Sequence, residues 1–192
     1  MSELVFLLEE ESAKAMLESL LPRLLDTRIV VRAIAFEGKQ DLEKQLEKKL
    51  KNYANRHARF IVMRDQDSSP DCKLIKAALT DTCVRAGRAA TTLVRIACHE
   101  LESIYLADLA AVEQAIGIRG LHARQSKAKY RSPDLLGNPS EELKKLTHGK
   151  YQKVSGSRAI GQCLDPENPR SSSFKNLVAA IRKWEAELLG CL

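Results

Sequence analysis

Short apolar runs alternate with amphipathic, helix-forming stretches over the first 118 residues, and this alternation most constrains the fold. The strand-like runs cover residues 4–8, 29–36, 60–63 and 91–97. Each is followed by a stretch whose apolar residues recur at helical spacing, over residues 12–25, 41–53, 71–87 and 99–116. Because parallel strands need crossover connections, this order predicts a mostly parallel four-stranded sheet with helices on both faces. We expect an α/β, Rossmann-like core.

The last third of the chain differs in composition. Residues 119–139 are rich in Gly, Pro, Ser and Lys, which predicts a loop, and helices are expected at 140–146, from near residue 157, and at 173–189. Ser140 is the expected N-cap of the first of these. Residues 119–192 hold 14 Lys and Arg against 7 Asp and Glu, a net charge of +7, whereas residues 1–118 hold 17 against 18. We expect an α/β core over 1–118 and a basic, loop-rich, helical extension over 119–192 that packs on it.

Several classes of protein are disfavoured. No apolar run approaches the length of a membrane span, and the first residues lead into a strand rather than a signal peptide. No phosphate-binding GxxxxGK[ST] loop is present, and Ser103 stands where a zinc protease needs its second histidine. We expect a cytoplasmic protein, without a membrane partner, whose scattered cysteines form neither disulfides nor a zinc site: Cys72, Cys83, Cys98, Cys163 and Cys191.

Acidic residues follow three of the four expected strands. Glu9 follows the first, Asp65 and Asp67 follow the third, and Glu100 and Glu102 follow the fourth. Since the carboxyl ends of parallel strands meet at one edge, we expect these carboxylates to lie close together and to repel one another. Mg²⁺ and Mn²⁺ prefer oxygen ligands and would relieve that repulsion. The five residues are therefore candidate metal ligands.

Structural explanations also exist for the same residues. Asp65 and Asp67 would also suit a polar turn before the helix expected from residue 71. Glu10 would also suit a first helical turn, where the helix dipole favours acidic residues. Glu100 and Glu102 would be splayed by about half a turn if they already belong to a helix.

These residues resemble the topoisomerase–primase (Toprim) domain, whose signature is a Glu after the first strand and an Asp-x-Asp after a later one. Glu9 matches the first position, and Asp65 with Asp67 match the second. Residues 64–68, 95–108 and 151–156 more specifically resemble a bacterial domain-of-unknown-function family, family 4276, which is regarded as Toprim-like. Glu10 occupies a position where Toprim sequences usually have glycine, which leaves either Glu9 or Glu10 as the functional carboxylate. Glu9 is favoured because it follows the strand directly.

The resemblance implies Mg²⁺- or Mn²⁺-dependent phosphodiester chemistry, as in topoisomerases, primases and overcoming-lysogenisation-defect nucleases. In the expected mechanism Asp65 and Asp67 hold one ion, and Glu100 with Glu102 hold a second or orient its waters. Glu9 acts as a ligand or as a general acid or base, so the catalytic set is Glu9, Asp65, Asp67 and Glu100. Family members are often encoded beside an ATP-binding-cassette ATPase, which implies such a partner and a role in anti-phage defence.

Five basic residues are candidates for neutralising the phosphates of DNA or RNA: Lys127, Lys129, Arg131, Lys150 and Lys153. Tyr130 and Tyr151 lie among them, and either stack on bases or pack within the extension. The main hypothesis is a metal-dependent nuclease. The alternatives are a non-catalytic Toprim-fold subunit that binds an ATPase or a nucleotide, and a phosphohydrolase of small substrates. Whether the chain forms a homo-oligomer is left open.

Overall fold

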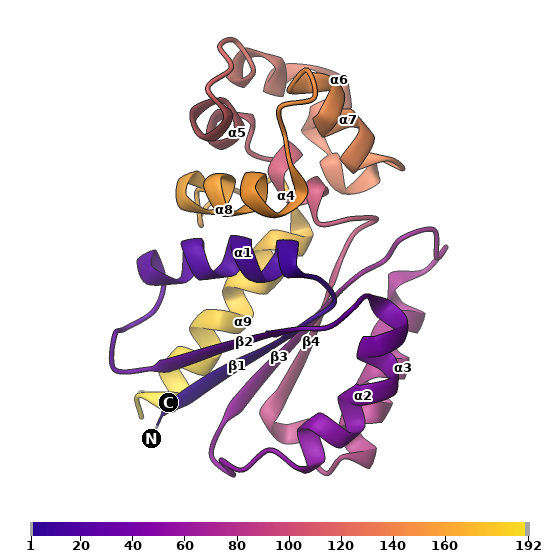
Figure 1. The fold of residues 1–192 in the computed structure, drawn as a ribbon, viewed down its shortest axis with the longest axis vertical. Helices are drawn as coiled ribbons and strands as arrows, with labels where there is room; N and C mark the ends of the chain where they lie inside the picture. Colours follow the sequence, from indigo (N-terminus) through magenta and orange to yellow (C-terminus); the bar gives the residue numbers. More distant parts are fainter. Residues whose placement is uncertain (1, 191–192) are drawn as a thin grey trace.

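The computed structural model describes residues 2–190, which contain a four-stranded sheet that is parallel throughout (Figure 1). The strands are β1 (Glu3–Leu8), β2 (Val30–Ala35), β3 (Arg59–Asp65) and β4 (Thr92–Ala97), in the spatial order β2-β1-β3-β4. Leu4 of β1 pairs with Val31 on one side and Arg59 on the other. Every residue of β1 is buried, as its uninterrupted apolar sequence predicts for a central strand. The predicted α/β architecture is confirmed.

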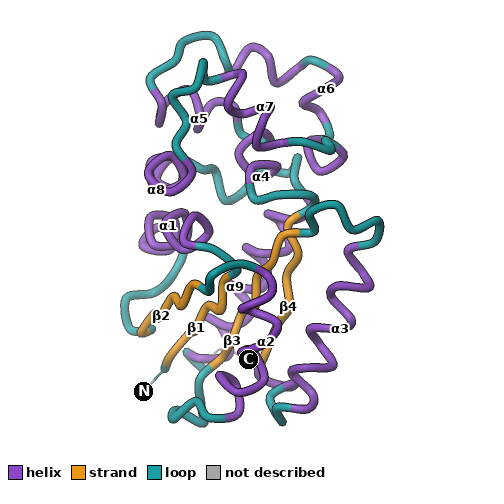
Figure 2. Tube along the Cα trace, turned by 45° about the vertical axis from the view of Figure 1, so that its right-hand side comes forward, coloured by secondary structure: helices purple, strands orange, loops and turns teal. Residues whose placement is uncertain are grey.

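Helices cover both faces of the sheet (Figures 1 and 2). On one face α2 (Lys39–Lys51) and α3 (Cys72–Arg85) pack on Val5 and Leu7 of β1. On the other face α1 (Glu11–Leu20) and α9 (Ser172–Leu188) pack on Leu4, Phe6 and Leu8. Because successive side chains of a strand point to opposite faces, β1 contributes to both halves of the core.

A helical lobe lies above α1 in Figure 1. It contains α4 (Glu102–Leu106), α5 (Leu109–Ile116), α6 (Ala128–Arg131), α7 (Pro139–Leu146) and α8 (Lys153–Cys163). Short 3₁₀ turns occur at Leu21–Arg23, Ala89–Thr91, His122–Ser126 and Pro133–Leu135. One apolar cluster joins side chains of α1, α8 and α9, so the last third of the chain shares the core of the sheet. The division at residue 118 stays a prediction.

The long helix predicted over residues 99–116 is wrong, because the structure has α4 and α5 instead. Asp108 separates them: its Oδ1 accepts a hydrogen bond from the Ala111 N–H at 3.1 Å and caps α5. Its Oδ2 accepts from the Asp165 N–H at 2.9 Å. The sequence pattern does not distinguish an aspartate on the polar face of a long helix from an aspartate that caps a new helix.

Boundaries after residue 118 also differ from the predictions. The segment 119–139 contains α6 and two 3₁₀ turns rather than loop alone. Helix α7 begins at Pro139 with Asn138 as its N-cap, so Ser140 is not the cap. Helix α8 begins at Lys153, earlier than predicted. Among the described cysteines Cys72, Cys83, Cys98 and Cys163 are free thiols, and Cys191 lies outside the described residues. No helix within residues 2–190 has the length and apolar character needed to span a bilayer.

Trp184 connects α9 to the sheet by a hydrogen bond. It is 1% exposed, and its Nε1–H donates a hydrogen bond to the Phe60 carbonyl oxygen at 2.9 Å. We expect Trp184→Phe to lower the free energy of unfolding by about 1–3 kcal/mol, because the buried carbonyl loses its donor. Urea unfolding measures this, with Lys175→Ala on the exposed side of the same helix as the control. An unchanged midpoint would show that this hydrogen bond contributes nothing.

Candidate functional site

Backbone hydrogen bonds continue beyond the ends of the strands and hold the candidate residues in register. The Glu9 N–H donates to the Met63 carbonyl oxygen at 3.2 Å, across β1 and β3. The Asp67 N–H donates to the His99 carbonyl oxygen at 2.6 Å, from the end of β3 to the end of β4. The residues after three neighbouring strands therefore lie at one edge of the sheet, as the sequence predicts.

Glu9 is directed towards the end of β3. Its Oε2 accepts a hydrogen bond from the Asp65 N–H at 3.1 Å, and Arg64 Nε lies 3.8 Å from the same oxygen. Only 7% of Glu9 is exposed, and this burial raises the pKa of its carboxyl group. The hydrogen bond from Asp65 opposes that rise, and the negative charge of Asp67 adds to it. A carboxyl group in this setting holds a proton more readily than one in water.

The charges of Glu9 and Glu102 both act on Asp65. Neighbouring atoms enclose Asp65, although part of its surface stays accessible, and its Oδ2 accepts from the Leu101 N–H at 3.2 Å. Burial raises the pKa of Asp65 well above its usual value, and the charges of Glu9 and Glu102 raise it further. Glu102 is 1% exposed, accepts a hydrogen bond from Tyr151 Oη at 2.9 Å and also has a pKa raised by burial.

Lys153, at the first position of α8, extends towards this acidic set. Its Nζ lies 2.5 Å from Oε2 of Glu10. Burial alone would lower the pKa of Lys153, but the bond to Glu10 and the charges of Glu102 and Asp65 outweigh it, so the pKa is raised. The two successive glutamates thus differ in role: Glu9 faces Asp65, and Glu10 faces Lys153. Which of the two is the functional carboxylate stays a prediction.

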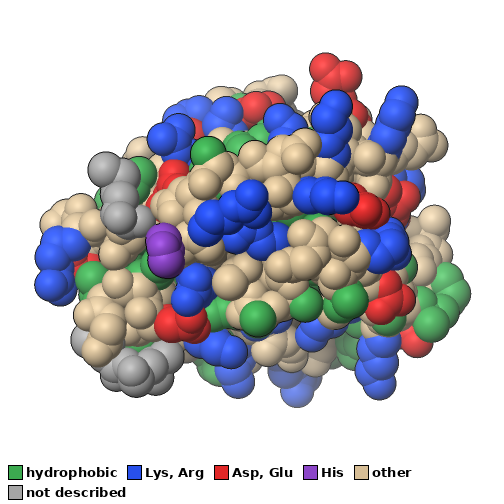
Figure 3. All heavy atoms as spheres, turned by 90° about the horizontal axis from the view of Figure 1, so that it is seen from below, with side chains coloured by type: hydrophobic (Ala, Val, Ile, Leu, Met, Phe, Trp, Pro, Cys, Tyr) green, Lys and Arg blue, Asp and Glu red, His purple; other side chains and the backbone are tan. Residues whose placement is uncertain are grey.

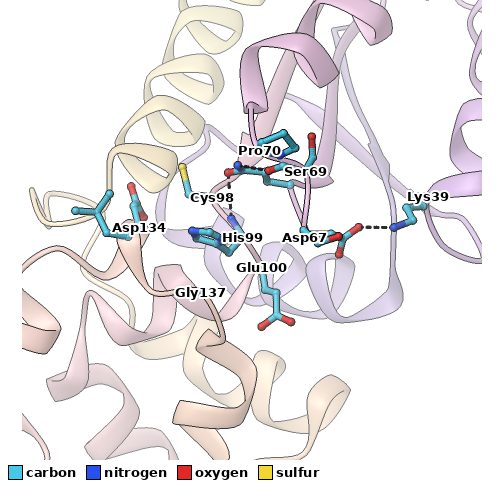
Figure 4. A pocket seen from close by; sticks show the side chains of 12 residues that line it. Lys39, Asp67, Ser69, Pro70, Cys98, His99, Glu100, Asp134 and Gly137 are labelled. Atoms are coloured by element: carbon cyan, nitrogen blue, oxygen red, sulfur yellow. Dashed lines mark hydrogen bonds and ion pairs between the residues drawn. The ribbon is translucent and has the colours of Figure 1, made fainter.

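Asp67 lines a cavity of about 790 Å³ (Figure 4), whereas Glu9 and Asp65 line a separate pocket of about 10 Å³. Its Oδ2 lies 2.9 Å from Nζ of Lys39, the first residue of α2. Asp67 and His99, both on the cavity wall, have positive φ angles of 53° and 57°. Such angles are rare for residues with a Cβ and are found preferentially at functional sites.

Glu100 lines the same cavity, but its carboxylate is hydrogen-bonded to the helical lobe. Its Oε2 accepts a hydrogen bond from the Ser140 N–H, in the first turn of α7, at 2.7 Å. In Figure 4 its carboxylate points away from Asp67. Sequence analysis missed Lys39 and His99 as residues of this cavity. Gly38, with a φ of 95°, marks the sharp turn that places Lys39 at the end of β2.

The donor atoms at this edge of the sheet are carboxylate oxygens, which are the type of ligand that a hard divalent cation binds. Within residues 2–190 no three His, Cys, Asp or Glu side chains are already arranged as a metal site. Glu9, Asp65 and Asp67 nevertheless offer carboxylate oxygens, which are the donors that Mg²⁺ and Mn²⁺ prefer. The charge of Asp67 acts on Glu9, and the charge of Glu9 acts on Asp65. Glu100 and Glu102 already bind Ser140 and Tyr151, and their roles as ligands stay predictions.

The predicted nucleic-acid-binding residues have different surroundings. Lys129 Nζ lies 2.5 Å from Oε2 of Glu142, whose other oxygen accepts a hydrogen bond from Tyr130 Oη at 2.5 Å. Tyr130 and Tyr151 are both buried, so the stacking interpretation is wrong for this structure and the packing interpretation holds. Three of the predicted residues are exposed and lie outside the cavity wall: Lys127, Arg131 and Lys150.

Comparison with known proteins agrees with this fold. A family model described as "Domain of unknown function (DUF4276)" matches residues 8–182. Among solved structures, the chain is similar to the C-terminal region of the Burkholderia pseudomallei OLD protein, with a TM-score of 0.53 and 15% identity. That alignment covers 94% of this chain and 97% of the other. A search of curated proteins finds no significant match. The Toprim-like fold expected from the sequence is confirmed.

Proposed function

This chain belongs to the DUF4276 family of domains of unknown function, and from that premise we propose that it is a metal-dependent nuclease. It would hydrolyse phosphodiester bonds of DNA or RNA. The observation that carries the proposal is the pairing of Glu9 with the Asp65 backbone at the carboxyl edge of the sheet, with Asp67 two residues further on. Buried, mutually repelling carboxylates next to a cavity are costly to keep without a cationic ligand.

Each residue of this edge has a chemical task. Asp65 and Asp67, together with Glu9, would hold Mg²⁺ or Mn²⁺, and the bound ion supplies polarisation of the phosphate and a lower pKa of water. The raised pKa of Glu9 suits it to accept a proton from an attacking water or to return one to the leaving oxygen. Lys39, beside Asp67, offers a positive charge to a phosphate oxygen in the cavity.

Calorimetric titration with Mg²⁺ and with Mn²⁺ tests the proposal. We expect wild type to bind the ion and the double variant Asp65→Asn/Asp67→Asn to lose binding, because amides cannot provide the negative charge. Asp81→Asn, at an exposed position of α3, is the matched control and should bind as wild type does. Binding by wild type that both variants retain would overturn the assignment of these carboxylates. Cleavage of labelled DNA and RNA is then compared among the same proteins.

One observation favours a second candidate function. Glu10, Asp67, Glu100 and Glu102 already have protein partners, which is also what a non-catalytic Toprim-fold subunit would show. Such a subunit would bind an ATPase or a nucleotide. Absence of ion binding by the wild-type protein, together with absence of cleavage, would favour this function over the nuclease. The ATPase partner and the role in defence stay predictions.

A further inference from the structure

A second cavity of about 360 Å³ lies along β4, at the edge of the sheet. Its floor is formed by Val94, Arg95 and Ile96 of β4. One wall carries Lys73 and Lys76 of α3, and the other carries side chains from the first turns of α9, including Ser172 and Asn176. We call this cavity the β4 groove. It lies between α3 and α9.

The β4 groove is positively charged. Lys73, Lys76 and Arg95 line it, and no carboxylate is among its lining residues in the described part of the chain. Arg95 donates from Nε to the Asn176 carbonyl oxygen at 2.8 Å and from Nη1 to the Val94 carbonyl oxygen at 2.8 Å, so its charge faces carbonyl groups and no acid. The carboxylate of Asp71, just before Lys73, accepts the Lys73 backbone N–H and caps α3.

The two lysines of the β4 groove differ from other basic side chains near the site in their ion-pair partners. Lys39, Arg64 and Lys153 each lie within 4.0 Å of a carboxylate. No ion pair of Lys73 or Lys76 occurs among residues 2–190. Both lysines are also exposed, so their charges are free to meet an anion.

The β4 groove adjoins the cavity of Asp67. Cys98, just after β4, lines both of them. Figure 4 shows Cys98 beside His99 on the wall of the larger cavity. A chain of anionic groups that lies along β4 and passes Cys98 would enter the cavity lined by Lys39 and Asp67. Its position next to that cavity, rather than positive charge alone, distinguishes this groove from the rest of the surface.

We infer that the β4 groove binds a single strand of nucleic acid by its phosphates and leads that strand to the carboxylates. The inference rests on the proposed nuclease function and names the path of its substrate. Lys73 and Lys76 of α3 and Arg95 of β4 suit successive phosphates, and a groove with a helix on each side suits one backbone better than a duplex. Base recognition is not required, since no aromatic side chain lines the groove.

Positive charge alone is a weak guide in this protein. Lys and Arg side chains are also numerous on the end of the molecule opposite the helical lobe, where acidic side chains lie among them (Figure 3). Lys48 and Lys51, in the last turns of α2, are exposed and line neither cavity. Lys48→Ala/Lys51→Ala therefore removes the same charge as Lys73→Ala/Lys76→Ala and is the matched control.

Fluorescence anisotropy with a labelled oligothymidylate of about 16 nucleotides tests the inference, in EDTA so that no cleavage occurs. We expect Lys73→Ala/Lys76→Ala to weaken binding by about tenfold at low salt. The slope of log K against log salt should fall by about 1.4, as expected for two lost phosphate contacts on a single strand. The control variant should bind as wild type does, and both variants should keep the wild-type affinity for Mg²⁺.

The outcomes separate the two proposals. If wild type binds the strand and both variants bind it equally well, the β4 groove is not its path, while the nuclease proposal stands. If wild type binds a duplex of the same sequence more tightly than the single strand, the assignment of a single strand is wrong. If wild type binds neither, a nucleic-acid substrate is wrong and the inference falls with the proposed function.

Discussion

Replacing Asp65 with asparagine is expected to abolish metal-dependent cleavage and, at the same time, to stabilise the metal-free protein. Asparagine keeps an oxygen that accepts the Leu101 N–H but removes a charge from a position enclosed by protein atoms. In wild type that charge is opposed by burial and by the charges of Glu9 and Glu102. We expect the free energy of unfolding to rise by about 1–3 kcal/mol at neutral pH. Cleavage should fall below detection, because the variant loses a ligand of the ion that would activate the attacking water.

The pH dependence of stability gives this prediction a second readout. The pKa values of Glu9, Asp65 and Glu102 are raised in the folded protein, chiefly by burial, so the folded state binds protons more tightly than the unfolded chain. The free energy of unfolding should therefore rise as the pH falls from neutral through the folded pKa values of these groups. Asp65→Asn removes part of that rise, so its advantage over wild type is largest at high pH and shrinks in mild acid.

At lower pH other groups reverse the trend. A hydrogen bond from the Arg28 side chain lowers the pKa of Asp26 to about 2, and one from the His122 backbone lowers the pKa of Glu113 to about 2. Groups of this kind stabilise the fold above their unfolded pKa, and that contribution is lost as the pH falls towards 2. A maximum of stability in mild acid is thus expected for wild type. Urea unfolding over a pH series measures it, with Asp81→Asn as the control.

Two results would contradict this prediction. If Asp65→Asn unfolds, the carboxylate is a structural acceptor whose charge is needed, and the site assignment is wrong. If the variant is more stable but cleaves as well as wild type, Asp65 is a buried charge without a catalytic task. Only stabilisation combined with loss of cleavage is the signature of a group kept for function at a cost in stability.

Gly161→Ala is expected to destabilise the protein, although alanine normally strengthens a helix. A Cβ at Gly161 would lie 2.5 Å from the carbonyl oxygen of Met16 and 3.1 Å from its Cα. These are backbone atoms of α1 in the buried contact between α1 and α8, so they cannot rotate away. The two helices must separate, which costs about 1–3 kcal/mol for an overpacked core and outweighs the gain of about 1 kcal/mol in helix propensity.

The same substitution tests how the helical lobe supports the site. Lys153 begins α8, so movement of this helix displaces Lys153 from Glu10 and disturbs the surroundings of Glu102. We expect weaker Mg²⁺ binding by calorimetry in addition to a lower urea midpoint. Gln162→Ala, at the next and exposed position of α8, is the control and should change neither. A stabilised Gly161→Ala protein would show that α1 and α8 are not in close backbone contact.

The sequence by itself determined the sheet and the edge at which the site lies. The apolar residues 4–8 of β1 predict a central strand, and the apolar spacing within α1 and α2 predicts their buried faces. Glu9, Asp65 and Asp67 follow predicted strands, and parallel pairing brings such positions together whatever the details of packing. These features can be predicted from the sequence because hydrophobic periodicity and the order of the strands depend on residues that are close together in the chain.

Tertiary structure alone decided which polar groups meet. Lys153, predicted to bind nucleic acid, pairs with Glu10, and Glu100, predicted to bind a metal, accepts the Ser140 N–H in the first turn of α7. Neither partner is visible in the sequence, and both predicted roles stay predictions. The break at Asp108 depends on Asp165, far along the chain. A long polar side chain reaches in several directions, and its partner depends on where distant helices pack. The hydrophobic pattern specifies that a helix is buried, but only the packed structure sets the position of that helix along its neighbour.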